Sequence, residues 1–307
     1  MQQSAQKSGP LAVVTGANAG LGFETARGLV YQHYRLVLAA RNEEKGQAAV
    51  RALLKDCPRA DVRFAPLDLA RLASVRDFAT ELRKQGDPIE VLINNAGIMA
   101  LPERELTEDG FERQLGVNYL GHFLLTSELL PLLTTAEAPR VVQLSSLAHR
   151  GGTIDFDDLH GERRYNPWRA YRQSKLAMLL FSQALQAHSD RDTWGIDSLA
   201  AHPGLARTAL FDHGVRSRAL IGMVFRAALP ILTQSAADGA RPVLHAATAS
   251  DIRPGDYYGP GGIAETRGAP AHAHLSRAAR DDALAERLWQ VSCGLTGARW
   301  EDGASSA

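Results

Sequence analysis

The chain has 307 residues, 45% of them hydrophobic and 22% charged, a balance typical of a soluble globular enzyme with one large or two modest domains. Lysine plus arginine and aspartate plus glutamate each number 34, so the zero net charge gives no general attraction to nucleic acid or to an anionic membrane. Cys57 and Cys293 lie far apart without CxxC spacing, which disfavours a disulfide framework and favours the reducing cytoplasm. Residues 1–9 are polar and are expected to form a flexible lead-in.

From residue 11 onward, apolar runs of strand length alternate with segments of helical spacing. The runs are nearly continuous in apolar residues, as in strands that are buried on both faces of a sheet. Strands are predicted at 11–16, 35–40, 61–68, 89–97, 140–146 and 196–204, with a last short one near 256–259. Helices are predicted at 23–32, 43–55, 72–85, 107–133, 168–189 and 283–297.

This alternation predicts an α/β fold, a doubly wound parallel sheet of about seven strands with helices on both faces. No shift in composition divides the chain, so residues 10–300 are expected to form a single domain. In such sheets a ligand binds at the carboxyl ends of the strands, where the strand order reverses. The functional residues are therefore expected in the turns that follow the strands.

The first strand runs into the turn TGANAGLG, residues 15–22, in which Gly16, Gly20 and Gly22 have G-x3-G-x-G spacing. Glycines permit a tight turn and a close approach of the backbone to a pyrophosphate. The helix that begins near Leu21 directs its free N–H groups to the same point, and Asn18 lies between the glycines. The turn predicts a dinucleotide site, and a tight turn that serves packing alone is the alternative.

The second strand ends in Ala-Ala-Arg, residues 39–41. A site for NAD(H) usually has an acidic residue here to bind the ribose 2′-hydroxyl. Arg41 instead offers a guanidinium that suits a 2′-phosphate, which favours NADP(H) over NAD(H). A solvated arginine at a helix start is the alternative. Asn42 is expected to cap the next helix and to lie beside the cofactor.

Seven short motifs follow one another along the chain: TGANAGLG, LDLA (67–70), NNAG (94–97), GVNYLGHF (116–123), LSSLAH (144–149), YRQSK (171–175) and HPG (202–204). In this order they resemble the short-chain dehydrogenases/reductases over about residues 10–210. The stretches LAARNEEKG and GVNYLGHFLLT look like the retinol dehydrogenase-like branch of that family. The resemblance implies a Rossmann-type fold and an oxidoreductase that uses a nicotinamide dinucleotide.

The resemblance also implies a catalytic group of Asn118, Ser146, Tyr171 and Lys175. Hydride transfer to a carbonyl builds negative charge on oxygen, which needs a proton donor and a hydrogen-bond donor. Tyr171 would give the proton and Ser146 would orient the substrate oxygen. A free phenol has a pKa of about 10, and the Lys175 ammonium together with a positive nicotinamide is expected to lower it by about 3 units.

Two of these residues have further implied tasks, and one assignment is open. Lys175 would bind the ribose hydroxyls of the nicotinamide half, and Asn118 would hold a water that links Lys175 to solvent. Ser145 and Ser146 both follow the strand. Alignment with the family motif favours Ser146, which directly precedes Leu-Ala-His where the strand ends. A residue one place earlier would point to the other side of the strand, and Ser145 stays an alternative.

Further cofactor contacts are implied motif by motif. Asp68 and Leu69 are expected beside the adenine, with Val117 supporting the cofactor from below and Asn94 serving the structure. Other residues would line the path from the adenosine ribose to the nicotinamide or cover the carboxamide and pyrophosphate: Asn95, Ala96, Gly97, Pro203, Gly204 and Thr208.

The substrate side is expected to come from the last third of the chain. Segment 205–235 is apolar enough to form a lid over an apolar substrate, and a packed surface helix or membrane contact through it are the alternatives. Segment 251–297 is expected to be a loop followed by a helix, with Tyr257 and Tyr258 at the rim of the pocket. Two copies of the chain can pair through the 107–133 and 168–189 helices, as members of the family often do.

The sequence therefore predicts an NADP(H)-dependent oxidoreductase that interconverts an alcohol and a ketone or aldehyde of an apolar small molecule. Reduction of a conjugated C=C bond and a non-catalytic dinucleotide sensor or scaffold are the alternatives. His122 and His149 have no partners at metal-ligand spacing, so no metal is assigned. No nucleic-acid partner and no stable membrane insertion are expected.

Overall fold

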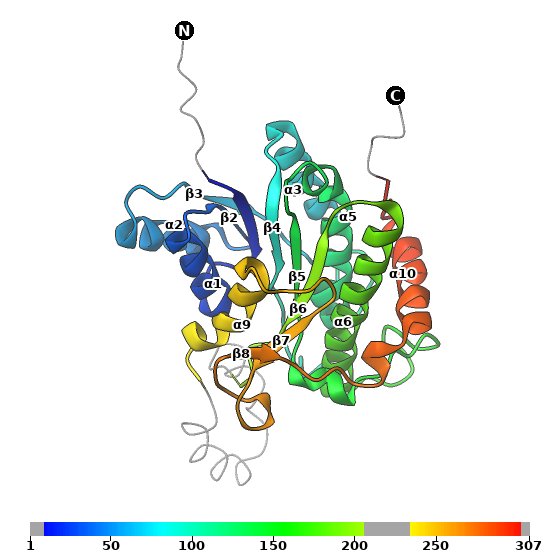
Figure 1. Cartoon of the computed structure of the whole chain (residues 1–307). Helices are drawn as coiled ribbons and strands as arrows, with labels where there is room; N and C mark the ends of the chain where they lie inside the picture. The colour runs from blue at the N-terminus through cyan, green and yellow to red at the C-terminus, as the bar shows by residue number, and fades with distance from the viewer. Residues whose placement is uncertain (1–8, 206–233, 302–307) are drawn as a thin grey trace.

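The computed structural model describes residues 9–205 and 234–301. Eight strands form one sheet in the order β3-β2-β1-β4-β5-β6-β7-β8, and only the pair β7–β8 is antiparallel (Figure 1). The strands are β1 (Leu11–Thr15), β2 (Arg35–Ala40), β3 (Val62–Pro66), β4 (Ile89–Asn94), β5 (Arg140–Leu144), β6 (Asp197–Ala201), β7 (Tyr257–Pro260) and β8 (Pro270–His272).

Helices cover both faces of the sheet (Figure 1). One face carries α1 (Gly20–Tyr31), α2 (Glu43–Asp56) and α9 (Ala236–Thr248), and the other carries α3 (Leu72–Gln85), α5 (Gly121–Leu133), α6 (Pro167–Asp192) and α10 (Asp282–Thr296). Shorter helical turns are α4 (Arg113–Leu115), the π-helical η1 (Gly116–Leu120) and the 3-10 turns η2 (Leu147–Gly151), η3 (Ile263–Glu265) and η4 (Ala278–Arg280).

Strand β1 illustrates why the sheet has a core on each side. Alternate residues of a strand point to opposite faces. Val13 of β1 accordingly packs into the core beneath α3, α5 and α6, whereas Ala12 and Val14 pack beneath α1 and α9. All residues of β1 and β2 are buried, which agrees with their unbroken apolar sequences.

The strand order reverses beside β1. The chain moves outward from β1 to β2 and β3 and then returns to β4 on the other side of β1. The glycine turn follows β1, and the NNAG motif begins in the last residue of β4. Both predicted cofactor motifs therefore lie at the reversal point, where sheets of this type bind their ligands.

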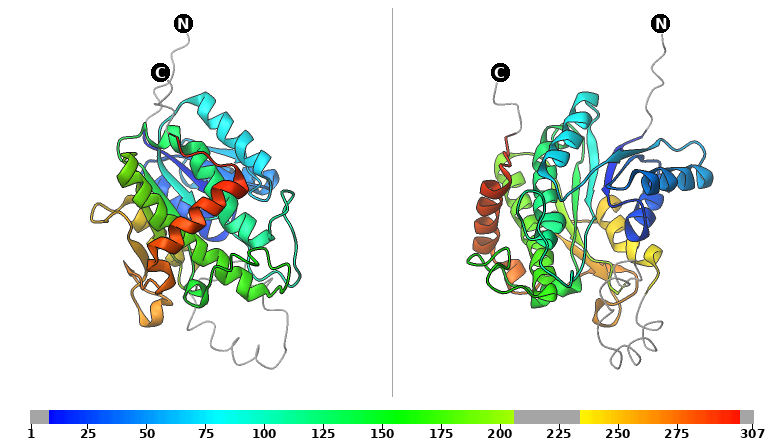
Figure 2. Two further views of the ribbon diagram at one scale, coloured as in Figure 1. Left: turned by 90° about the vertical axis from the view of Figure 1, so that its right-hand side faces the viewer. Right: turned by 180° about the vertical axis from the view of Figure 1, so that it is seen from behind.

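α10 covers the outer side of α6 and also contacts α5 (Figure 2). Trp289 of α10 is the centre of this contact, with its ring centroid 5.0 Å from Phe123, 6.0 Å from Phe181 and 4.2 Å from Trp300. His188 of α6 stacks on Trp289 at 4.0 Å. The C-terminal helix thus packs on part of the surface of the 168–189 helix, and the predicted pairing of two copies through the 107–133 and 168–189 helices stays a prediction.

The predicted fold class is confirmed, with four differences in detail, the first of which is that helix α9 (Ala236–Thr248) was not predicted. An eighth strand, β8, escaped prediction because its three residues, Pro-Ala-His, show neither alternation nor an apolar run. The predicted helix 107–133 begins only at Arg113 and passes through a π-helical turn. Tyr257 and Tyr258 are buried in β7, the strand predicted near 256–259, rather than placed at a pocket rim.

The predicted lid falls mainly in residues 206–233, which lie outside the described residues, as does Thr208. Among the described residues, no helix combines the length and the apolar character needed to cross a membrane.

Candidate active site

The turn after β1 can be built only with glycine at two of its positions. Gly16 has φ +66°, and a Cβ there would lie 2.9 Å from the Ala96 Cα. A Cβ on Gly22 would lie 2.4 Å from the Gly16 carbonyl oxygen and 2.5 Å from the Asn95 Nδ2. The turn is therefore folded tightly onto the NNAG motif, which leaves backbone on its outer surface.

The N-terminus of α1 has no side-chain cap. Ala19 stands at the cap position, whereas Asn42, Asn166, Ser235 and Asp281 cap α2, α6, α9 and α10 with their side chains. The first N–H groups of a helix need partners, and with the dipole they favour an anion. Gly20 begins this helix, Leu21 is buried in the core and Asn18 is half-buried, so the turn fits a pyrophosphate through its backbone.

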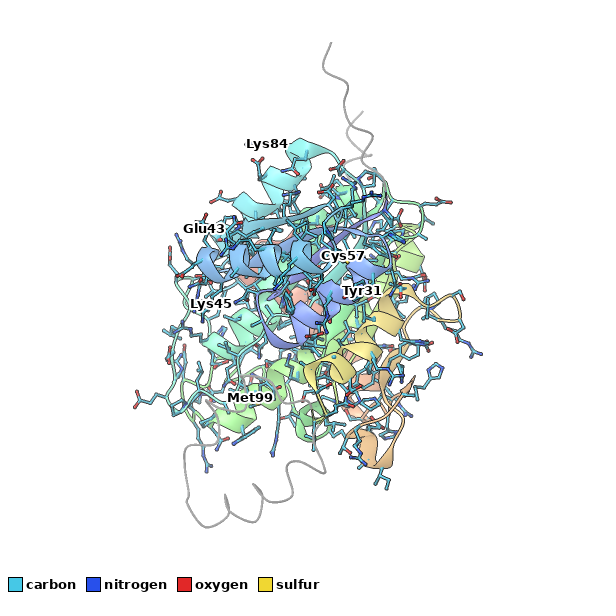
Figure 3. All side chains as sticks on the ribbon, turned by 90° about the vertical axis from the view of Figure 1, so that its left-hand side faces the viewer. Tyr31, Glu43, Lys45, Cys57, Lys84 and Met99 are labelled. Carbon is cyan, nitrogen blue, oxygen red and sulfur yellow. The ribbon has the colours of Figure 1, made fainter. Side chains whose placement is uncertain are left out.

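The end of β2 lies directly beside this turn, because the Gly16 N–H donates to the Ala39 carbonyl at 2.7 Å. Arg41 follows β2 and is exposed. Asn42 caps α2 through its Oδ1, which accepts the Lys45 N–H at 2.8 Å, so its side chain is engaged as the predicted cap. Figure 3 shows Glu43 and Lys45 at this end of α2 and Cys57 at the other.

Asp68 and Leu69, which were predicted to lie beside the adenine, follow β3 and differ in the groups that they could offer. Asp68 is half-buried and accepts the Ala70 N–H at 3.0 Å, which holds the turn. The Leu69 side chain is buried in the core, and a Cβ on Gly121 would lie 3.0 Å from its Cβ. Leu69 can therefore reach an adenine only through its backbone.

The NNAG motif is fastened to the first strand by Thr15. Its Oγ1 accepts the N–H groups of Asn95 and Ala96, both at 2.9 Å, and the Asn95 side chain donates to the Thr15 carbonyl at 2.7 Å. Asn94 points into the sheet, where it donates to Thr126 and Gln143, which agrees with a structural role. Sequence reasoning missed Thr15, although it opens the glycine motif and stands at a fully buried strand end.

Gly97 lies between the cofactor turn and the catalytic group. A Cβ there would lie 3.2 Å from the Asn118 Oδ1 and 3.5 Å from the Lys175 Nζ. The missing side chain leaves this space open beside both residues. Val117, which precedes Asn118, is half-buried and packs against the core next to them.

Asn118 lies within the π-helical turn η1, and such turns often occur at functional sites. Its Oδ1 accepts the Ile98 N–H at 2.8 Å, while its Nδ2 donates to the Ile98 carbonyl and to Ser174 Oγ, both at 2.9 Å. The side chain is thus fully engaged in fixing the segment after NNAG. The predicted water relay through Asn118 stays a prediction.

A buried histidine connects Asn118 to the cofactor turn. The His122 Nδ1 lies 3.0 Å from the Asn118 carbonyl, to which it donates, and its Nε2 lies 2.9 Å from Thr15 Oγ1. A neutral ring whose Nε2 accepts from Thr15 Oγ1 fits this pattern. Burial lowers the pKa of His122 to about 3, which keeps the ring neutral. His122 therefore supports the site as a hydrogen-bond bridge rather than as a metal ligand.

Ser146, Tyr171 and Lys175 come together at the carboxyl end of β5. Lys175 donates to the carbonyl of Leu144, the last residue of β5, at 2.9 Å, and its Nζ lies 6.0 Å from the Tyr171 ring centroid. The Ser146 hydroxyl lies near enough to the Tyr171 phenol to influence its pKa. Tyr171 and Lys175 are one turn apart in α6 and both are buried, so they face the same place.

Burial dominates the protonation of the two α6 residues. It raises the pKa of Tyr171, an effect that the nearby Ser146 hydroxyl opposes, and it lowers the pKa of Lys175 to about 8. The expected lowering of the Tyr171 pKa needs the positive nicotinamide as well as Lys175, and it stays a prediction; in the protein alone, burial raises this pKa. A phenol that stays protonated at neutral pH is the form that can donate a proton.

The structure places the two competing serines on opposite sides, as their alternation predicts. Ser145 is 2% exposed and donates to the Lys175 carbonyl at 2.8 Å, so its hydroxyl serves to fix α6 on β5. Ser146 is half-buried, begins the turn η2 by accepting the Ala148 N–H, and reaches Tyr171. The arrangement favours Ser146 as the residue that meets a substrate oxygen.

Pro203 and Gly204 follow β6 and are half-buried on the same edge of the sheet. Gly204 has φ +62°, and a Cβ there would lie 2.3 Å from the Thr266 carbonyl oxygen. Trp168 stands one turn before Tyr171, with the ring centroids 6.1 Å apart in an edge-on contact, and is 42% exposed. Trp168 therefore offers an aromatic surface at the entrance to the catalytic group, which sequence reasoning did not single out.

Within the described residues, no group of three or more His, Cys, Asp and Glu side chains is arranged to hold a metal ion. His149 instead fixes η2, with its Nδ1 2.7 Å from the Ser146 carbonyl oxygen.

The family model described as "short chain dehydrogenase" matches residues 10–218, which is more than half of the sequence. The chain belongs to the short-chain dehydrogenase family. Its curated relatives include a polyprenol dehydrogenase from Mus musculus, 42% identical over 94% of this chain and 84% of the relative. Retinol dehydrogenase 12 from Homo sapiens is 40% identical over 96% of this chain and 89% of the relative. The predicted resemblance to the retinol dehydrogenase-like branch is confirmed.

Solved structures agree with this assignment. An uncharacterised protein from Mycobacterium paratuberculosis is 38% identical, covers 95% of both chains and superposes with a TM-score of 0.77. A Shigella flexneri short chain dehydrogenase complexed with NADP superposes with a TM-score of 0.63 at 22% identity, covering 81% of this chain and 95% of that one. A Brucella melitensis 3-oxoacyl-[acyl-carrier protein] reductase in complex with NAD also has a TM-score of 0.63, at 23% identity, covering 81% of this chain and 94% of that one. The fold therefore accommodates either nicotinamide dinucleotide.

Proposed function

We propose that the protein is an NADP(H)-dependent oxidoreductase that interconverts an alcohol and a ketone or aldehyde. The observation that carries the proposal is the meeting of Ser146, Tyr171 and Lys175 at the carboxyl end of β5. The space over Gly97 brings this group within reach of the cofactor turn. A bound nicotinamide dinucleotide would supply or accept the hydride.

Each catalytic side chain has a task that its surroundings support. The buried phenol of Tyr171 is protonated at neutral pH and gives its proton to the oxygen of the reduced carbonyl. Ser146 donates a hydrogen bond to the same oxygen and orients it. Lys175, which donates to the carbonyl at the end of β5, would bind ribose hydroxyls of the cofactor. Its positive charge would also stabilise the phenolate that Tyr171 becomes when it gives up its proton.

The preference for NADP(H) rests on Arg41. It is exposed directly after β2, in the position where an acidic residue would bind the ribose 2′-hydroxyl of NAD(H). A guanidinium at this point forms charge-assisted hydrogen bonds to a 2′-phosphate. The other residues at the end of β2, Ala39 and Ala40, are buried and carry no charge.

The substrate is proposed to be an apolar alcohol or carbonyl compound. Trp168 offers an exposed aromatic surface beside Tyr171. Two of the relatives are named for retinol and polyprenol, both of which are alcohols with a long hydrocarbon part. The cytoplasm is the proposed location, because Cys57 and Cys293 are unpaired thiols, as expected in a reducing compartment.

The proposal is tested by following NADPH oxidation with retinoid, polyprenoid, steroid and aromatic aldehydes or ketones, with identification of the product. Replacing the proton donor, Tyr171→Phe, is expected to lower kcat/KM by about 10²–10⁴-fold, the usual contribution of a positioned acid, and to leave NADPH binding nearly unchanged. Tyr31→Phe, on a side chain that is 58% exposed at the far end of α1, is the matched control.

Full activity of the Tyr171→Phe enzyme would show that another group donates the proton. A saturated carbonyl product from an unsaturated substrate would identify a C=C reductase instead. NADPH binding without turnover of any compound in the panel would favour a sensor or scaffold.

A further inference from the structure

Glu265 is a carboxylate that none of the preceding steps uses, yet it lies behind the nicotinamide end of the site. It belongs to the loop 262–268 between β7 and β8, far in sequence from every catalytic residue. Its side chain is only 19% exposed. It contacts one side chain from the segment after Ser146 and another from the HPG motif.

The first contact is with His202 of the HPG motif. The Glu265 Oε2 lies 3.0 Å from the His202 Nε2, and the His202 Nδ1 accepts the Gly204 N–H at 3.1 Å. Because Nδ1 accepts a hydrogen bond, the proton of the neutral ring is on Nε2 and is donated to Glu265. His202 is fully buried, so the carboxylate fixes both the tautomer of the ring and the position of Gly204.

The second contact is with Arg150 of η2, the helical turn that begins at Ser146. The Arg150 Nη2 lies 2.7 Å from the Glu265 Oε1, which also accepts the His274 N–H at 3.1 Å. Both oxygens of the carboxylate are therefore engaged. Through Arg150 the same carboxylate holds the turn whose first residue is the proposed catalytic serine.

The loop around Glu265 holds the turn 203–205 at further points. The Leu205 N–H donates to the Thr266 carbonyl at 2.9 Å, and Gly204 has no room for a Cβ against the same carbonyl. Gln234 joins the two segments, because it donates to the Pro203 carbonyl at 2.8 Å and accepts the Gly268 N–H at 3.4 Å. The turn that was predicted to cover the nicotinamide is thus seated on the loop 262–268.

The loop 262–268 has a strained backbone, which indicates that its conformation serves a function. Ala264 and Glu265 have φ values of 52° and 55°, a left-handed conformation that is unfavourable for residues with a Cβ. Strain of this kind persists only where surrounding contacts impose it, and it concentrates at functional sites. Here the conformation turns the Glu265 carboxylate inward to His202 and Arg150.

We propose that Glu265 is a positioning residue for the nicotinamide end of the site. Its carboxylate holds the turn 203–205 through His202 and the η2 turn through Arg150. This fixes the position of the carboxamide site relative to the catalytic serine. This role rests on the proposed function, because it assigns the turn 203–205 to the nicotinamide. The contacts support it: burial raises the pKa of the Glu265 carboxyl, but the His274 N–H, Arg150 and His202 together hold that pKa below its usual range.

The test compares two ligands, NADPH and 2′-phospho-ADP-ribose, which lacks the nicotinamide. Glu265→Gln removes the charge at nearly constant size and is expected to raise the Kd for NADPH about tenfold, as for a lost charge-assisted hydrogen bond. The Kd for 2′-phospho-ADP-ribose is expected to change less than about twofold, because the turn 15–22 and Arg41 do not touch Glu265. Glu108→Gln, which removes an exposed carboxylate paired with Arg71, is the matched control.

A second measurement needs no cofactor. Hydrogen exchange of the Gly204 and Leu205 amides is expected to be about tenfold faster in Glu265→Gln than in the parent protein, with no change at Asn95 and Ala96. Arg150→Gln, at an exposed partner, is expected to give a smaller rise in the NADPH Kd and keeps the test valid if the Glu265 variant is unstable.

The outcomes separate the two proposals. If the parent protein binds and oxidises NADPH but the ratio of the two Kd values is the same in all variants, the positioning role of Glu265 is overturned while the proposed function stands. An equal loss of affinity for NADPH and for 2′-phospho-ADP-ribose would indicate general destabilisation and would also overturn the positioning role of Glu265. If the parent protein binds no dinucleotide, the proposed function fails, and unaltered exchange at Gly204 and Leu205 would then overturn the contact role as well.

Discussion

The two ends of the proposed cofactor site are built in different ways. The adenosine end consists of the turn 15–22, whose glycines and free N–H groups present backbone. The nicotinamide end consists of the turn 203–205 and the η2 turn, which side chains of the distant loop 262–268 hold in place. The adenosine end depends on glycines that lack a Cβ, whereas the nicotinamide end depends on hydrogen bonds and ion pairs made by side chains.

This difference determines how each end can be damaged. A glycine turn fails when an atom is added, because no space exists for a Cβ. A network of buried polar groups fails when one partner is removed or changes its protonation state, because the others are left without hydrogen bonds. The two ends share one feature, which is a buried neutral histidine beneath each of them: His122 beneath the first and His202 beneath the second.

Lowering the pH is therefore expected to destabilise both ends together. The loss in the free energy of unfolding should be larger than that caused by any of the substitutions below. Burial lowers the pKa of His202 to about 4 and that of His122 to about 3, below the usual value near 6.5. Between those values the unfolded chain binds protons that the folded protein does not, so the free energy of unfolding falls as the pH falls. At about 1.4 kcal/mol per pH unit and histidine, the two together remove roughly 5 kcal/mol between pH 6.5 and 4.5.

The measurement is denaturant unfolding at pH 7, 6.5, 5.5 and 4.5. The control is His272→Gln, at a side chain that is 66% exposed, which is expected to leave the slope of stability against pH unchanged. A free energy of unfolding that stays constant from pH 6.5 to 4.5 would contradict the assignment of two neutral buried histidines.

Gly22→Ala is expected to damage the adenosine end alone. The new Cβ would lie 2.4 Å from the Gly16 carbonyl oxygen, so the turn or Asn95 must shift. Overpacking of this kind costs about 1–3 kcal/mol, and the Kd for NADPH is expected to rise about tenfold or more as the N–H groups lose their arrangement. Unfolding and cofactor titration measure the two effects.

The matched control is Gly294→Ala in α10, where a Cβ would meet nothing within 4 Å and alanine favours the helix. Hydrogen exchange at Gly204 and Leu205 is expected to stay as in the parent protein. Unaltered NADPH affinity in Gly22→Ala would show that the turn does not hold the cofactor through its backbone.

The contrast between the two ends also explains what the sequence could reveal. The glycine turn, the uncapped start of α1 and the Tyr171–Lys175 spacing depend on residues within one turn of each other, so their pattern is visible in the sequence. The parallel sheet follows from the alternation of apolar strands with helices. The choice of Ser146 over Ser145 came from the family motif and from alternation at the strand end, and the Ser145 hydroxyl is indeed engaged with the Lys175 carbonyl.

The remaining features depend on contacts between residues far apart in the sequence. Glu265 and His202 are separated by more than sixty residues, and no local pattern indicates that they meet. The cover of α6 by α10 depends on Trp289 reaching Phe123 and Phe181, and β8 is too short to show alternation. The burial of Tyr171, which raises its pKa in the protein alone, is likewise a property of the packed protein.

Arg41→Ala is the mildest change and sharpens the comparison, because it tests the one charged side chain proposed for the adenosine end. Arg41 is exposed, so its loss should leave stability within about 0.5 kcal/mol of the parent protein. The Kd for NADPH is expected to rise about tenfold, the effect of losing a charge-assisted hydrogen bond, while the Kd for NADH stays the same. Fluorescence titration with both cofactors measures the difference between the two Kd values, and Arg51→Ala, at an exposed position in α2, is the control.

Equal affinities for NADPH and NADH in the parent protein would remove the argument for a 2′-phosphate site. A gap that closes only in Arg41→Ala would show that the adenosine end selects the cofactor through a single exposed side chain, whereas the nicotinamide end depends on a buried network.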